Sequence, residues 1–141
     1  MNAESSKWVE VASKLIKLTQ EGRLKWKKAI GDYSLDNIEN TDLAFVTQYK
    51  NKTLRIYRFR YKVEAPTAGL SSISNFSTAI SIYGERKYPY WASAVVLEFI
   101  DDQGNSLWKF PDTKALDDLY SSIQYTVAGV SDFLEDILND E

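Results

Sequence analysis

A segment of alternating aromatic and basic residues, at positions 57–63, constrains the fold more than any other part of this chain. Successive side chains of a β-strand point to opposite faces of the sheet, so a two-residue period predicts a strand with two different faces. One face is apolar and the other basic: Tyr57, Phe59, Tyr61 and Val63 alternate with Arg58, Arg60 and Lys62. We therefore expect the aromatic face to pack into the core and the basic face to contact solvent.

Further strands are predicted around this one. The two-faced strand covers residues 53–64 and pairs with residues 43–49 across a short turn. Three more strands are predicted at residues 79–87, 91–100 and 106–110, and the second of these is so apolar that we expect it inside the sheet. Residues 23–28 alternate apolar with basic and fit either a short strand or an irregular crossing. Loops are expected at residues 31–41 and 65–77.

Helices are predicted at both ends of the chain. Residues 5–22 repeat apolar side chains with a period of 3.6, and Gly22 can end that helix. A second stripe begins after residues 111–113 and ends at Gly129, and a short acidic helix follows from about Ser131. This order predicts one α+β domain over residues 1–141: an antiparallel five-stranded meander with an N-terminal helix and two C-terminal helices packed on one face.

The sequence argues against catalysis. It contains no His and no Cys, so the best side chain for proton transfer near neutral pH and the usual thiolate nucleophile are both absent. No Gly-rich phosphate loop or nucleophile elbow is present. The acidic turn at residues 101–105 lacks the ligand order of a calcium loop. We therefore expect no enzyme activity, no cofactor and no metal site.

Charge is unevenly distributed along the chain. Residues 1–62 hold 13 Lys or Arg against 7 Asp or Glu, whereas residues 63–141 hold 4 against 13. We interpret this asymmetry as acidic helices that neutralise a basic sheet within one domain. The start of the chain has no apolar segment typical of a signal peptide, and no apolar run is long enough to span a bilayer. We expect a cytoplasmic protein without membrane contact.

Three segments, residues 15–26, 104–111 and 116–120, together resemble a group of small bacterial or phage hypothetical proteins. In that group a helix ending in Leu-Thr-x-x-Gly and a nearby Trp precede a sheet, and the chain ends in a Leu-Tyr helix and a short acidic helix. Here Leu18, Thr19, Gly22 and Trp26 match the first motif. The resemblance implies a bacterial or phage origin and this order of elements, and it brings no activity and no catalytic residue.

Two sets of residues are candidates for binding. Tyr88, Tyr90 and Trp91 form a dense aromatic connection before a strand, and because neighbouring strand residues alternate in direction we expect at least one ring to be accessible. Arg58 and Arg60 lie on the basic face and could contact phosphates. The structural interpretations are that the rings close one end of the core and that the basic face is solvated or covered by the acidic helices.

From these observations we expect a non-enzymatic binding or regulatory module that acts by protein–protein contact, with another protein or a second copy bound through a sheet edge or the aromatic connection. The alternative is a small-ligand or nucleotide-binding factor related to phage or bacterial defence, with residues 65–77 as a lid over Tyr88, Tyr90 and Trp91. A weak nucleic-acid binder is the third hypothesis, and the acidic balance of the chain argues against it.

Overall fold

The structure, a computed structural model, describes residues 3–34, 41–65 and 88–140. The chain forms two compact units, one of residues 1–59 and 94–141 and one of residues 60–93. Within the described residues the helical elements are α1 (Ala3–Gln20), the 3-10 turn η1 (Gly31–Tyr33), α4 (Lys114–Val127) and α5 (Val130–Leu138). The strands are β1 (Lys27–Lys28), β2 (Phe45–Tyr49), β3 (Lys52–Val63), β4 (Tyr90–Ile100) and β5 (Ser106–Lys109).

These strands form one antiparallel sheet in the order β1-β2-β3-β4-β5. The predicted α+β meander with one N-terminal and two C-terminal helices is therefore confirmed. Residues 27–28 settle the alternative that the sequence left open, since they pair with β2 as a short strand. The apolar strand β4 lies inside the sheet as expected, with a neighbour on each side. The strand predicted at residues 79–87 falls outside the described residues.

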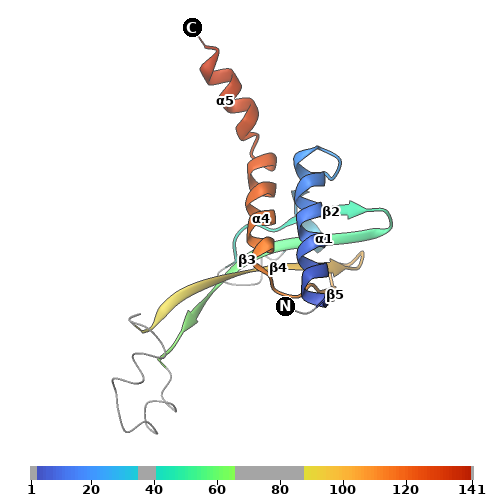
Figure 1. The fold of residues 1–141 in the computed structure, drawn as a ribbon, viewed down its shortest axis with the longest axis vertical. Coiled ribbons are helices and arrows are strands. Elements are labelled where there is room, and N and C mark those ends of the chain that lie inside the picture. The colour runs from blue at the N-terminus through green and yellow to red at the C-terminus, as the bar shows by residue number, and fades with distance from the viewer. Residues whose placement is uncertain (1–2, 35–40, 66–87, 141) are drawn as a thin grey trace, which may run out of the picture. The chain divides into compact units, whose positions relative to one another are not determined.

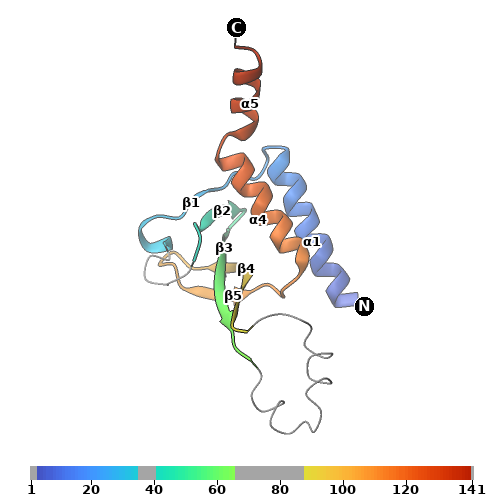
Figure 2. The same ribbon diagram turned by 90° about the vertical axis from the view of Figure 1, so that its left-hand side faces the viewer.

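Two helices, α1 and α4, lie side by side over one face of the sheet (Figure 1). Figure 2 shows the same pair after a quarter turn, with the strands to their left. The 3.6-residue stripes predicted for both helices supply the buried side chains, because a helix face repeats every three to four residues. The core cluster includes Ala12, Leu15 and Leu18 of α1, Leu116, Leu119, Tyr120 and Ile123 of α4, and Phe45, Leu54, Ile56, Val95 and Leu97 of the sheet.

The face of β3 that meets the helices is the opposite of the predicted one. Leu54 and Ile56 are buried in the core, and Arg58 continues their face, with its guanidinium 4.8 Å from the centre of the Tyr120 ring. Tyr61 is 44% exposed, so the prediction that its face packs into the core is wrong there. Alternation defines two faces of a strand. The face that the helices cover is the one that carries the aliphatic residues Leu54 and Ile56. The alternation of aromatic and basic residues further along the strand does not reveal this.

The other face of β3 is also buried in its first half. Arg55 donates from Nε to Oε2 of Glu98 on β4 at 2.9 Å and from Nη1 to the Tyr33 carbonyl at 3.0 Å. Burial raises the pKa of Tyr57 on this face, with a further rise from the charge of Glu98 and an opposing effect of Arg55. Phe59 is half-buried, with its ring 6.4 Å from that of Tyr57. The expected division into a core face and a wet face therefore does not hold here.

The second C-terminal helix also differs from expectation. The sequence predicts that α5 packs on the sheet with α4, yet none of the side chains of α5 is buried. Gly129 separates the two helices in a left-handed conformation with φ 71° and ψ 32°, which a residue without Cβ adopts at little cost. Because the helix is interrupted there, the apolar side of α5 does not continue the buried side of α4.

Candidate functional site

The helix α5 carries a row of exposed apolar side chains. Phe133, Leu134, Ile137 and Leu138 are 63%, 44%, 52% and 80% exposed. Together with Val130 they occupy positions i, i+3, i+4, i+7 and i+8, which share one side of an α-helix. Contiguous exposed apolar side chains mark interaction sites more often than scattered ones do. We call these five residues the α5 apolar face.

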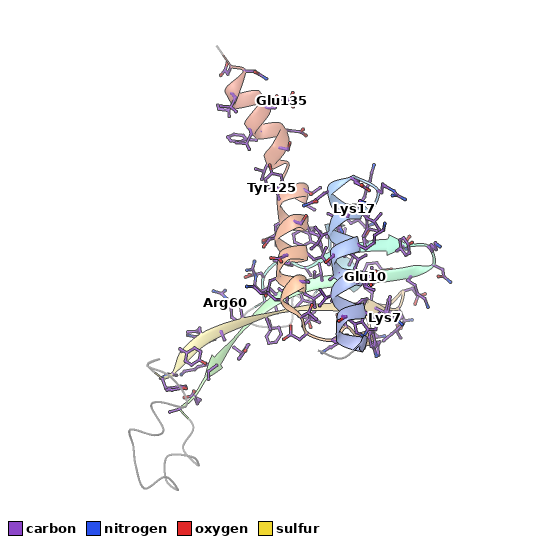
Figure 3. The ribbon with its side chains drawn as sticks, viewed as in Figure 1. Lys7, Glu10, Lys17, Arg60, Tyr125 and Glu135 are labelled. Carbon is purple, nitrogen blue, oxygen red and sulfur yellow. The ribbon has the colours of Figure 1, made fainter. Side chains whose placement is uncertain are left out.

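The opposite side of α5 is acidic. Asp132, Glu135 and Asp136 all lie off the α5 apolar face at helical spacing, and Figure 3 labels Glu135 on this helix. The sequence contains no Lys or Arg after Lys114, so no positive charge within the helix offsets these carboxylates. The helix is thus amphipathic and negatively charged, with its apolar side exposed to water.

An apolar groove of about 400 Å³ lies between α1 and the sheet. Val11, Leu15 and Leu18 form its wall on α1, at positions i, i+4 and i+7 of one helix side. Phe99 of β4 and Phe110, which follows β5, line it from the sheet. Three of these five side chains, those of Val11, Phe99 and Phe110, are only partly buried, so apolar surface is accessible in the groove.

The rim of this groove is basic. Lys14, Arg23 and Lys52 line it, together with the ring of Tyr49, and among the described residues that line it none is acidic. Arg23 also lies 3.6 Å from the carboxylate of Glu21, in an ion pair whose side chains are 68% and 39% exposed. Exposed ion pairs of this kind contribute little to stability, so the guanidinium remains available to a further carboxylate. We call this feature the α1 groove.

The aromatic connection lies at the start of β4, in the unit of residues 60–93. The rings of Tyr88 and Tyr90 are 5.4 Å apart and tilted by 52°. Trp91 is 59% exposed, which confirms that at least one of the three rings is accessible. Their role in binding stays a prediction.

The two predicted basic residues have different surroundings. Arg58 packs on Tyr120, its Nε lies 3.2 Å from Oδ2 of Asp42, and its Nη2 donates to Oε1 of Gln124 at 3.4 Å. Arg60, labelled in Figure 3, is exposed. Arg58 therefore already links β3 to α4 through the Tyr120 ring and the Gln124 amide, and it pairs with Asp42 before β2, which leaves its guanidinium less free to bind a phosphate. Phosphate binding by either residue stays a prediction.

Among the residues that the structure describes, no group of three His, Cys, Asp or Glu could hold a metal ion. In the same parts of the chain, no helix combines the length and apolar character needed to cross a membrane. The buried charges of Arg55 and Glu98 neutralise each other at 2.7 Å, and the Tyr33 carbonyl accepts a further donor of Arg55. Buried charges satisfied in this way are typical of structural ion pairs.

Comparisons of the chain with protein-family models, with curated proteins and with solved structures find no match. The arrangement of side chains is therefore the basis for any functional assignment.

The α5 apolar face and the α1 groove escaped the sequence prediction of binding residues. The sequence does show the spacing of the face, but a stripe of this kind predicts burial within the chain as readily as an exposed contact. Residues of α1, the β2–β3 hairpin, β4 and the segment after β5 line the groove. Because these segments are far apart in the sequence, no local sequence pattern predicts the groove. The charge asymmetry of the sequence did indicate that basic and acidic residues gather in different parts of the chain.

Proposed function

We propose that this protein is a non-enzymatic binding module that acts by contact with another protein molecule, and that α5 provides the contact. The observation that carries the proposal is the exposure of four large apolar side chains on one side of this helix. Burial of a Leu, Ile or Phe side chain contributes about 1.5–3 kcal/mol, so a partner that covers this side gains a substantial driving force. An amphipathic helix laid into an apolar groove is a recurring mode of protein recognition.

The acidic side of the helix supports the same proposal. Like charges repel nonspecific partners with acidic surfaces, and they steer the helix toward a basic partner. The proposal includes no catalytic residue and no cofactor. We also propose a cytoplasmic address, supported by the absence of Cys and therefore of disulfide bonds, which are common in oxidising compartments.

The test is to replace the exposed apolar side chains without disturbing the core. Phe133→Ser/Ile137→Ser removes two of the five side chains of the α5 apolar face, and neither residue is buried. We expect proteins that the tagged chain retains from native-host cells, identified by mass spectrometry, to be lost with this variant. The control is Tyr125→Ser/Val127→Ser, which removes two exposed apolar side chains from α4, 48% and 39% exposed. Retention of the same partners by the α5 variant would contradict the proposal.

A second candidate function rests on the exposure of Trp91. An accessible Trp beside two Tyr rings can cover a small ligand, which is the alternative drawn from the sequence. The variant Tyr90→Ala/Trp91→Ala removes two rings of the aromatic connection and leaves α5 unchanged, so it tests which of the two is the binding site. If this variant loses the partner while Phe133→Ser/Ile137→Ser keeps it, the aromatic connection rather than α5 is the site.

A further inference from the structure

We propose that the partner of α5 is a second copy of this chain, whose α1 groove receives the α5 apolar face. This inference rests on the proposed role of α5 and identifies the molecule that α5 binds. Each copy carries both an apolar helix side and an apolar groove. If each copy donates its α5 and receives that of the other, the contact closes into a symmetric dimer.

Charge complementarity is the first argument for this occupant. Glu135 and Asp136 lie at the two edges of the acidic side of the helix, nearest the α5 apolar face, and the groove presents Lys14 and Lys52 on its rim. Opposite charges around an apolar contact fix its orientation and disfavour other pairings. The uneven charge of the sequence, basic in residues 1–62 and acidic in residues 63–141, is then neutralised between molecules as well as within one.

Matching size is the second argument. The nine residues of α5 extend over ~13 Å at 1.5 Å per residue. The groove wall on α1, from Val11 to Leu18, extends over ~10 Å by the same rise. Partly buried Phe99 and Phe110 supply aromatic surface against which side chains such as Leu134 and Ile137 can pack. A single helix contact is small, but reciprocal exchange doubles it.

The first experiment measures the mass of the full-length chain by light scattering across a concentration series. We expect a monomer–dimer equilibrium, with a dissociation constant that rises when salt is raised from ~0.05 to ~0.5 M, because the rim charges are exposed and screened. A monomer at every concentration would overturn this inference. The proposed function would survive that result if partner capture still required Phe133 and Ile137, and it would fail separately if capture did not.

The decisive experiment exchanges the charges of the two surfaces. One variant carries Lys14→Glu/Lys52→Glu in the groove, and the other carries Glu135→Lys/Asp136→Lys on the helix. All four side chains are exposed, so both variants are expected to fold, which far-ultraviolet circular dichroism checks. We expect each variant alone to dimerise at least ~10-fold more weakly than the wild type, since like charges now face each other.

An equimolar mixture of the two variants restores both contacts. The acidic helix of the first variant meets the basic groove of the second, and the basic helix of the second meets the acidic groove of the first. We therefore expect the mixture to form a heterodimer at concentrations at which each variant alone is mostly monomeric. A matched control, Lys7→Glu/Lys17→Glu, makes the same charge change on α1 outside the groove, at two residues labelled in Figure 3, and should dimerise like the wild type or more weakly by less than ~3-fold.

Two results would overturn the inference even if the protein dimerises. If the groove variant dimerises as well as the wild type, the helix binds elsewhere, for example to a second α5. If the mixture fails to form a heterodimer, the two surfaces do not contact each other. Phe133→Ser/Ile137→Ser provides a variant without charge change, and it should abolish the wild-type dimer.

Discussion

At the scale of single residues, the buried ion pair of Arg55 and Glu98 is the least expected feature of the sheet. Their side chains are 6% and 1% exposed, and their atoms approach to 2.7 Å. Charges in such surroundings are stable only as a satisfied pair. The pair joins the two long neighbouring strands β3 and β4 on the face away from the helices.

We predict that Glu98→Gln destabilises the protein by ~3–5 kcal/mol, because it leaves the Arg55 guanidinium buried without a counter-charge. The double variant Arg55→Met/Glu98→Leu should be less destabilised than the single variant, since it removes both charges. Urea unfolding followed by tryptophan fluorescence measures both changes. Equal midpoints for Glu98→Gln and wild type would show that water reaches this pair.

Two buried tyrosines make stability sensitive to high pH. Burial raises the pKa of Tyr57 and of Tyr120 above the usual 10.0, and nearby Glu98 and Asp42 respectively raise them further. The unfolded chain then loses these protons before the folded chain does. Stability is fully present below pH 10 and falls as pH rises from there through the folded-state pKa.

We therefore expect the free energy of unfolding to decrease above pH 10, with a shallower slope in Tyr120→Phe. That variant also loses the hydrogen bond from the Tyr120 hydroxyl to the Leu43 carbonyl, 2.6 Å in length, so it should start about 1 kcal/mol less stable at neutral pH. Urea titrations at pH 8 to 11 measure the slope. An unchanged slope in the variant would show that Tyr120 does not contribute.

At the scale of elements, the apolar stripes of α4 and α5 have similar spacing but differ in burial. The stripe of α4 is buried at Leu116, Leu119, Tyr120 and Ile123, whereas no residue of the α5 stripe is buried. Helical periodicity specifies which side chains share a face but not what covers it. The left-handed Gly129 interrupts the helix between the two stripes.

This difference predicts opposite results for one substitution in two helices. Leu119→Ala should cost ~2–5 kcal/mol, because Leu119 is 0% exposed and its loss leaves a cavity. Leu134→Ala should change stability by less than ~0.5 kcal/mol at protein concentrations too low for the proposed dimer to form. Chemical denaturation at low protein concentration compares them. A large loss for Leu134→Ala in the monomer would show that α5 packs within the chain.

At the scale of the whole molecule, the net charge of −3 opposes nucleic acid while the first half of the chain is basic. We predict binding to single-stranded DNA or RNA weaker than ~10⁻⁶ M at physiological salt, since the acidic surroundings oppose phosphate. Fluorescence anisotropy with labelled oligonucleotides measures it. Tighter, salt-sensitive binding that disappears in Arg58→Ala/Arg60→Ala would contradict this prediction and support the nucleic-acid hypothesis.

The sequence by itself determined the fold class, the order of the strands flanking positions 50–52 and 101–105, and the stripes of α1 and α4. These features depend on local periods of two and 3.6 residues, which neighbouring residues specify. The tertiary structure decided which face of β3 meets the helices and that Arg55 pairs with Glu98. It also decided that no side chain on the apolar side of α5 is buried, while a basic-rimmed groove forms on α1. Each of these depends on contacts between residues far apart in the chain, and periodicity describes a face without naming the surface that covers it.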